Sequence, residues 1–136
     1  MKILLRIKQI EIVLFMKTLE IILKGGLKSC CSTYSADDMK DLTKSWFRDA
    51  NDVNFDIIDI ENDFYDTGVL ADLAYKYFGN VAFPMVYFNN QLITTGSFPE
   101  RHECMKIIEN PKALTQKEIE EEALKVAEQQ KNSNEN

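Results

Sequence analysis

The sequence predicts an α/β fold in which a central mixed sheet of about four strands is flanked by helices. Three observations predict it. Short apolar runs alternate with segments of helical periodicity, which is typical of strands joined by helices. Clusters of glycine, asparagine and serine separate these segments, as turns require. Two late apolar runs are separated only by Asn89-Asn90, which predicts an antiparallel hairpin and therefore strands of both directions in one sheet.

The first half of the chain is expected to contribute a strand, a helix and a second strand. The apolar run Thr18 to Leu23 ends at Lys24-Gly25-Gly26, the pattern of a buried strand stopped by a turn. Ser35 and the acidic residues after it predict a helix start, because a serine hydroxyl can cap free amides. The run Phe55 to Ile60 is almost continuously apolar, which predicts a strand at the centre of the sheet. The expected apolar face of the helix consists of Met39, Leu42, Trp46 and Ala50.

A second helix and a hairpin are expected next. Val69, Leu73 and Tyr77 recur at helical spacing, and Gly79-Asn80 follows them as a helix terminator. The hairpin strands are predicted over Pro84 to Phe88 and Gln91 to Thr95.

Two further helices are expected towards the C-terminus. Ser97-Phe98-Pro99-Glu100 combines a capping serine, a proline and a glutamate, and predicts a helix that runs to Asn110. Thr115 opens a second capping pattern and a charged helix. We therefore expect one core domain over 16–112, an N-terminal extension over 1–15 that could be strand or helix, and a charged C-terminal helix and tail over 113–136.

Charge and hydropathy disfavour two classes of partner. The net charge of the 136-residue chain is −6, so it offers no basic surface to the phosphates of DNA or RNA, and no nucleic-acid partner is expected. Arg6, Lys8 and Glu11 interrupt the apolar N-terminal stretch, which is too broken to provide the roughly 18 apolar residues of a membrane span. It also lacks the pattern of a signal peptide. No membrane association is expected, and a cytoplasmic location is the default expectation.

Cysteine usage points to a thiol site. The chain has three cysteines, an odd number, and Cys30 and Cys31 are neighbours, which does not fit a secreted disulfide framework. The pair lies between the first predicted strand and the helix expected at Ser35. Because the N-terminus of a helix favours negative charge, a cysteine just before it is expected to be activated as the thiolate. Cys104 instead shares a helical face with Ile107 and Ile108, which favours a place in the core.

The order of elements, with a cysteine site between the first strand and first helix, resembles the thioredoxin superfamily over roughly residues 17–110. A second mark is Ala82-Phe83-Pro84-Met85-Val86, in which a proline opens the third strand as the cis-proline of that family does. The resemblance implies a thioredoxin-like fold and a disulfide oxidoreductase function without a cofactor. It also implies a substrate groove shaped by Phe83 and Pro84, beside Ser32 and Thr33. Its partners would be protein or small-molecule thiols and disulfides.

The cysteine motif departs from the Cys-x-x-Cys of that superfamily. Cys30 and Cys31 are adjacent and could form a disulfide only through a strained ring, and strain raises the reduction potential. In a monothiol mechanism, one thiolate would form a mixed disulfide that a small thiol, the neighbouring cysteine or Cys104 resolves. Cys30 is the expected nucleophile and Cys31 its partner. The middle and later strands also resemble small bacterial thioredoxin-fold proteins described as disulfide oxidoreductases.

The string Cys30-Cys31-Ser32-Thr33 also resembles the thioredoxin-fold arsenical chaperone and repressor family, as does the stretch from Thr95 to Arg101. This resemblance implies a different function, the capture of trivalent arsenic or antimony by soft thiolates. The family has a third cysteine a few residues after the pair, at a place that lies near Ala36 in this chain, so Cys104 would have to complete the ligand set.

Other interpretations stay open beside these two. A thioredoxin-like scaffold that binds another protein without catalysis is a third function, and the sequence leaves the oligomeric state undetermined. A zinc site made from Cys30, Cys31, His102 and Cys104 matches none of the usual zinc spacings and is disfavoured. His102 is expected to face solvent.

Overall fold

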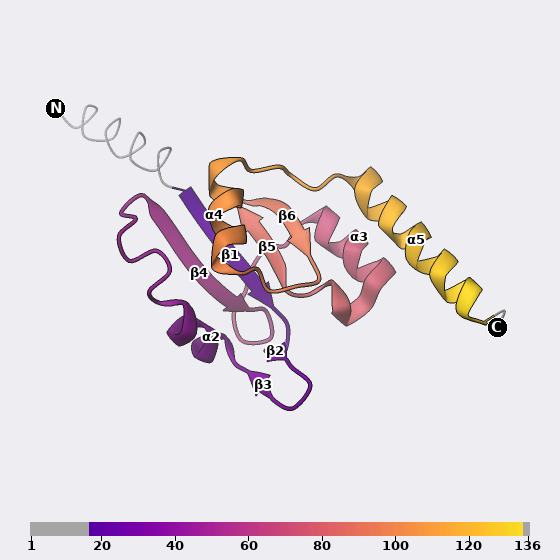
Figure 1. Cartoon of the computed structure of the whole chain (residues 1–136), viewed down its shortest axis with the longest axis horizontal. Coiled ribbons are helices and arrows are strands. Elements are labelled where there is room, and N and C mark those ends of the chain that lie inside the picture. The colour runs from indigo at the N-terminus through magenta and orange to yellow at the C-terminus, as the bar shows by residue number, and fades with distance from the viewer. Residues whose placement is uncertain (1–16, 135–136) are drawn as a thin grey trace.

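A four-stranded mixed sheet forms the centre of the part of the chain that the computed structural model describes, residues 17–134 (Figure 1). The strand order is β4-β1-β5-β6; β4 runs parallel to β1, whereas β5 is antiparallel to both of its neighbours. The strands are β1 (Lys17–Leu23), β4 (Val53–Asp59), β5 (Met85–Phe88) and β6 (Gln91–Thr95). The predicted mixed α/β architecture is therefore confirmed. The expected N-terminal extension, residues 1–15, lies outside the described residues.

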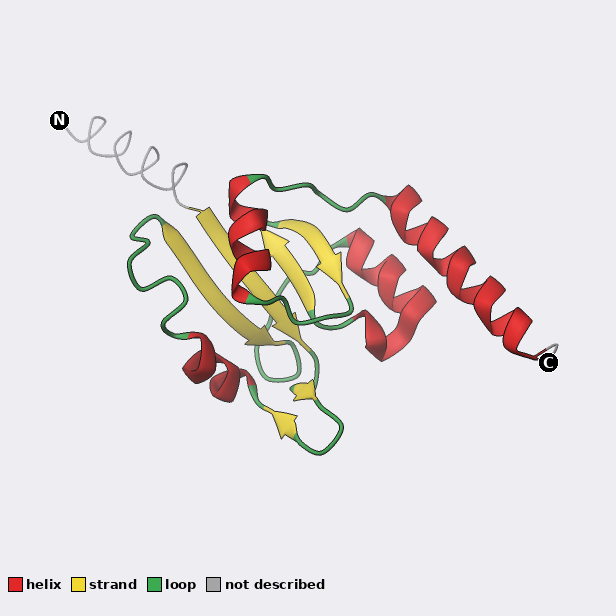
Figure 2. Ribbon diagram, in the orientation of Figure 1, coloured by secondary structure: helices red, strands yellow, loops and turns green. Residues whose placement is uncertain are grey.

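Helices cover both faces of the sheet (Figure 2). They are α2 (Ala36–Thr43), α3 (Val69–Phe78), α4 (Arg101–Glu109) and α5 (Gln116–Asn134), with a 3-10 turn at Gly79–Ala82. Successive side chains of a strand point to opposite faces. Leu19, Ile21 and Leu23 of β1 accordingly pack with Met39 of α2 and Cys104 of α4. Ile22 packs on the other face, in a cluster that also contains Ala71, Ala74, Met85, Tyr87, Leu92 and Ile119.

The prediction that Phe55 to Ile60 forms a central strand is wrong in position. The strand exists as β4, but it is one of the two edge strands of the described sheet, with β6 at the other edge, and β1 and β5 are the inner strands. Only Ile57 and Asp59 of β4 are buried, whereas all four residues of β5 are buried. An apolar run fits a partly covered edge strand as well as a central one, because periodicity does not report how many neighbours a strand has.

The helices α2 and α3 occur where they were expected, but the residues that they bury differ from those predicted. Ser35 caps α2, since its hydroxyl accepts a hydrogen bond from the backbone N–H of Asp38 at 3.0 Å. The helix ends at Thr43, so Trp46 and Ala50 lie beyond it, and Leu42 is 63% exposed rather than packed on the sheet. In α3 the small residues Ala71 and Ala74 are buried, whereas Val69 is 82% exposed and Tyr77 is also exposed.

The C-terminal helices also follow their predictions with shifted ends. Helix α4 begins at Arg101 and is capped by Glu100, so it starts later than the Ser97 motif indicates. Gly79 caps the C-terminus of α3 as expected. The start of α5 is held on the domain by the buried side chain of Ile119, and the N–H of Leu114 donates to the carbonyl of Leu92 in β6 at 2.8 Å. None of the helices within residues 17–134 is both long and apolar enough to cross a membrane.

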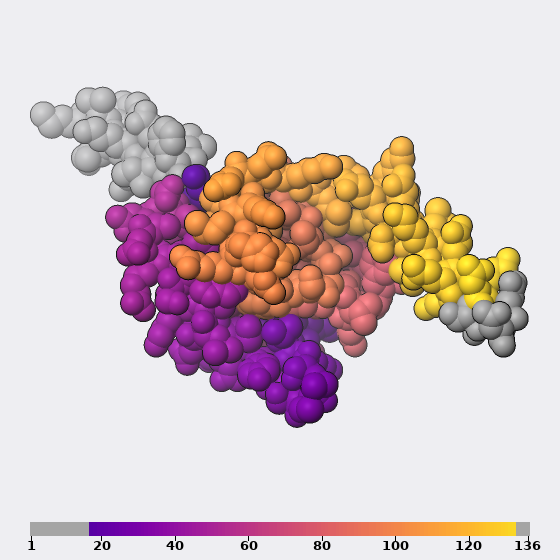
Figure 3. All heavy atoms as spheres, viewed as in Figure 1, coloured from indigo at the N-terminus to yellow at the C-terminus, as the bar shows by residue number. Residues whose placement is uncertain are grey.

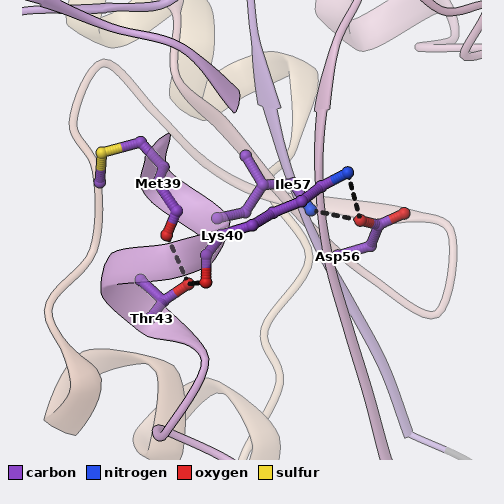
Figure 4. A network of polar contacts seen from close by, with 5 residues as sticks. All are labelled: Met39, Lys40, Thr43, Asp56 and Ile57. Carbon is purple, nitrogen blue, oxygen red and sulfur yellow. Dashed lines mark hydrogen bonds and ion pairs between the residues drawn. The ribbon is translucent and has the colours of Figure 1, made fainter. Parts of the chain in front are cut away.

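A small polar network joins α2 to the edge strand β4 (Figure 4). Asp56 Oδ1 accepts a hydrogen bond from the backbone N–H of Ile57 at 2.8 Å and lies 3.6 Å from the ammonium group of Lys40. The hydroxyl of Thr43 donates to the carbonyl of Met39 at 2.7 Å, which ties the last turn of α2 to the helix itself.

Candidate functional site

Cys30 and Cys31 lie at the tip of a β-hairpin that projects beyond the end of the sheet (Figure 1). Its strands are β2 (Leu27–Lys28) and β3 (Thr33–Tyr34), which pair antiparallel. Ser29 and Ser32 close the tip: the N–H of Ser29 donates to the carbonyl of Ser32 at 2.8 Å, and the N–H of Ser32 donates to the hydroxyl of Ser29 at 3.2 Å. In the space-filling view, the indigo atoms of this segment stand at the lower edge of the molecule (Figure 3).

The two thiols of the pair are exposed and close together. Both side chains face solvent, and their Sγ atoms are 3.3 Å apart. A nucleophile or soft ligand atom must be reachable by its target, and both sulfur atoms meet that condition. Their separation also lets one sulfur reach an atom bound to the other. The arrangement can therefore support thiol-disulfide exchange or two-point capture of a thiophilic ion.

The sequence led us to expect the cysteines directly at the N-terminus of a helix. The structure does not place them there. The strand β3 stands between the pair and Ser35, the N-cap of α2. That helix end is satisfied by its own residues, because Ser35 and Asp38 form a reciprocal capping box. The β2–β3 hairpin was not predicted. The available signals were a β-branched Thr33 followed by Tyr34, and the two serines that bracket the cysteines.

The turn beneath the hairpin is organised by Asp59, a residue that sequence reasoning missed. This residue is only 4% exposed and lies at the end of β4. Its Oδ2 atom accepts from the N–H of Gly26 at 2.7 Å, and its Oδ1 atom accepts from Gly25 at 3.1 Å and from Glu61 at 3.0 Å. Burial raises the pKa of Asp59, but the backbone donors of Glu61, Gly26 and Gly25 outweigh it and hold the pKa below its ordinary value.

Gly26 is required by the close approach of β3 to the turn. Its φ angle is +76°, a backbone conformation that residues other than glycine rarely adopt. A Cβ atom at this position would lie 2.7 Å from the carbonyl oxygen of Tyr34 and 2.8 Å from Cγ2 of Thr33. The backbone of the turn and the backbone of β3 are therefore in direct contact, so the position of the turn determines the position of the hairpin.

A groove of about 830 Å³ lies beside the base of the hairpin. It is lined by the stretch from Lys24 to Lys28, by Phe83 and Pro84, and by Phe98 together with other residues around them. The Phe83–Pro84 peptide bond is cis, and it precedes β5. The expected substrate residues are thus divided, because Phe83 and Pro84 line the groove whereas Ser32 and Thr33 belong to the exposed hairpin.

Cys104 is not placed with the other two cysteines. Its side chain is 0% exposed and packs in the core beneath α4, as its helical spacing predicted. Burial, with a smaller contribution from the charge of Glu103, raises the pKa of the Cys104 thiol to about 12. Cys104 is therefore neither an accessible resolving thiol nor a third ligand beside Cys30 and Cys31 in this conformation.

The zinc ligand set considered from the sequence is not assembled either. Within residues 17–134, the group of side chains close enough to hold an ion consists of Glu100, His102 and Glu103, whose ligand atoms lie within 4.8 Å of one another. All three are exposed, and the two glutamates already serve the capping box of α4. His102 faces solvent, as expected, with its Nδ1 atom 3.3 Å from Glu100.

Comparisons with known proteins do not assign this chain to a family. No protein-family model matches the sequence, and no curated protein matches it. A crystal structure of a protein of unknown function from Staphylococcus aureus is similar at 15% sequence identity and a TM-score of 0.44. The match covers 69% of this chain and 89% of the other.

Proposed function

We propose that the protein is a thiol-dependent redox protein of thioredoxin-like fold that exchanges thiols and disulfides through Cys30 and Cys31. The observation that carries the proposal is the pair of exposed sulfur atoms 3.3 Å apart at the hairpin tip. Exposure admits a substrate disulfide to either sulfur, and proximity supplies a second thiol for the next step. A buried or isolated cysteine would provide neither.

The order of elements supports the thioredoxin-like part of the proposal. Two parallel strands, β1 and β4, are connected through α2, and the β5–β6 hairpin adds two antiparallel strands on the other side of β1. The cysteine segment follows the first strand and precedes the first helix of this arrangement, and Pro84 precedes β5. These are the positions on which the resemblance in sequence rests.

The proposed reaction is a two-step exchange. The Cys30 thiolate attacks one sulfur of a substrate disulfide, the substrate S–S bond breaks, and the leaving thiolate takes up a proton. The Cys31 thiolate then attacks the Cys30 sulfur, which releases the second substrate thiol and leaves a Cys30–Cys31 disulfide. The two protein thiols are oxidised and the substrate disulfide is reduced to two thiols. An external thiol returns the protein to its reduced form. In the monothiol variant, that thiol resolves the mixed disulfide directly.

Capture of a metalloid is the second candidate, and the same sulfur separation favours it. Two exposed neighbouring thiolates suit a soft centre such as trivalent arsenic, which can be supplied as arsenite. The burial of Cys104 weighs against this candidate, because the third thiolate that the resembling family uses is not at hand.

Mass spectrometry of the reduced protein tests these functions. The protein is mixed with bis(2-hydroxyethyl) disulfide and quenched with acid. We expect wild type to acquire an internal disulfide and Cys31→Ser to stop at a mixed disulfide on Cys30. The matched control Cys104→Ala should behave as wild type, because that thiol is buried.

A parallel sample with arsenite separates the alternatives. Stoichiometric arsenite uptake that protects Cys30 and Cys31 from alkylation, without disulfide exchange, would replace the redox proposal with metalloid capture. If the pair neither exchanges disulfides nor binds arsenite, the redox proposal is refuted and a binding scaffold is left.

A further inference from the structure

We propose that Asp59 is a positioning residue that holds the Cys30–Cys31 hairpin beside the groove. The inference deepens the proposed function and rests on it for the reaction, but the anchoring itself is a separate, measurable property. Asp59 is placed at the end of β4, on the sheet rather than on the hairpin. It can therefore tie a projecting element to a rigid one.

The hairpin is joined to the sheet by the Asp59 hydrogen bonds and by the packing of Leu27 against the core cluster. Its own ladder consists of two paired positions, Leu27 with Tyr34 and Lys28 with Thr33. Gly25 and Gly26 connect the sheet strand β1 to the hairpin strand β2. The N–H groups of both glycines donate to the Asp59 carboxylate. A hydrogen bond to an ionised acceptor is roughly twice as strong as a neutral one. The bond from Gly26, at 2.7 Å, is the shortest of the three that Asp59 accepts.

The contact between Gly26 and β3 passes this constraint to the thiols. Because the Gly26 backbone abuts the carbonyl of Tyr34 and the side chain of Thr33, a shift of the turn moves β3 with it. Lys24 to Lys28 also line the groove, so the same turn forms one wall of the groove and the base of the hairpin. Asp59 thus determines how the sulfur atoms are presented to a molecule seated in the groove, without touching that molecule.

The test compares Asp59→Asn with Asp56→Asn. Asparagine has the shape of aspartate, but its NH2 group would face one of the backbone N–H groups that donate to Asp59. That hydrogen bond would be lost, because both groups are donors. Asp56 is the matched control, because it lies on the same strand and accepts a backbone hydrogen bond from Ile57 away from the hairpin. We expect Asp59→Asn to speed amide hydrogen exchange of residues 26–34 by about tenfold, with β1 and β5 unchanged. The amide proton of Gly26 should move upfield in the nuclear magnetic resonance spectrum.

A pair of substrates supplies the functional readout. We expect Asp59→Asn to reduce bis(2-hydroxyethyl) disulfide at the wild-type rate, because that probe needs only exposed sulfur. The second substrate is a disulfide that carries an extended peptide long enough to occupy the groove. Asp59→Asn should reduce this substrate about tenfold more slowly than wild type does. If Asp59→Asn does not fold, Asp59→Glu, which keeps the charge and changes its reach, takes its place.

Each outcome decides the inference. Unchanged exchange in residues 26–34, or faster exchange throughout the sheet, would overturn it, and so would an equal loss of rate for both disulfides. If wild type reduces neither disulfide, the proposed function fails by itself, and hydrogen exchange in the hairpin still decides whether Asp59 anchors it.

Discussion

Replacing Gly26 with alanine tests the close packing that supports the thiol hairpin. The substitution adds one Cβ atom, which would stand 2.7 Å from the carbonyl oxygen of Tyr34 at a φ angle of +76°. Gly68→Ala is a matched control, because Gly68 has a φ angle of +84° but nothing within 4 Å of the added atom. The control therefore isolates the cost of the backbone conformation, which we expect to be about 1–3 kcal/mol.

The additional cost of Gly26→Ala is limited by the strength of the hairpin. The clash is relieved when β3 moves away from the turn, and that movement sacrifices at most the two paired positions of β2 and β3. At about 0.5–1.5 kcal/mol net for each hydrogen bond, the extra destabilisation should be about 1–3 kcal/mol beyond Gly68→Ala. The hairpin should open locally while the sheet stays intact.

Urea unfolding and hydrogen exchange measure the two parts of this prediction. The free energy of unfolding should decrease in the order wild type, Gly68→Ala, Gly26→Ala. Exchange in residues 27–34 should increase only in Gly26→Ala. If both variants have the same stability and the hairpin amides stay equally protected, the contact between the turn and β3 does not exist in solution.

Two further predictions concern buried groups. Burial raises the pKa of Cys104 from 9.0 to about 12, so the unfolded state loses this proton first. Between about pH 9 and pH 12, the stability of wild type should therefore fall by up to about 1.4 kcal/mol per pH unit more than that of Cys104→Ala, as measured by urea unfolding. Tyr87→Phe removes the 2.7 Å hydrogen bond to the carbonyl of Thr67 and should cost about 1–2 kcal/mol in the same assay. Tyr77→Phe, at an exposed site, should cost little, and equal losses in the two tyrosine variants would contradict a special role for the buried hydroxyl.

Local signals in the sequence predicted the elements well. Asn89 and Asn90 adopt positive φ angles of 47° and 67° in the hairpin between β5 and β6, the conformation for which asparagine is suited. Ser35 caps the helix that it was expected to cap, and Cys104 is buried where its spacing with neighbouring apolar residues placed it. Each of these features depends on residues within one or two turns of chain, so the information is local.

Features that depend on distant residues were missed. The position of a strand in the sheet depends on the path of the whole chain. The apolar run of β4 does not indicate that this strand lies at an edge. Asp59 is an aspartate in an apolar strand, and its value becomes visible only when Gly25 and Gly26, more than thirty residues earlier, are brought to it. The position of Cys30 and Cys31 between the first strand and the first helix was expected, but the short hairpin that displays them was not.

The polar network on β4 has a consequence for the growth of the sheet. The N–H of Ile60 donates to the carbonyl of Leu23 in β1. Successive N–H groups of a strand point in alternate directions, so the N–H of Ile57 points away from β1. A backbone donor that points outward from an edge strand is where a foreign strand would pair. Asp56 already occupies it, at 2.8 Å, and brings a charge that Lys40 balances. An incoming strand would have to displace this carboxylate before it could pair with Ile57, so the contact opposes the pairing of two copies along the β4 edge.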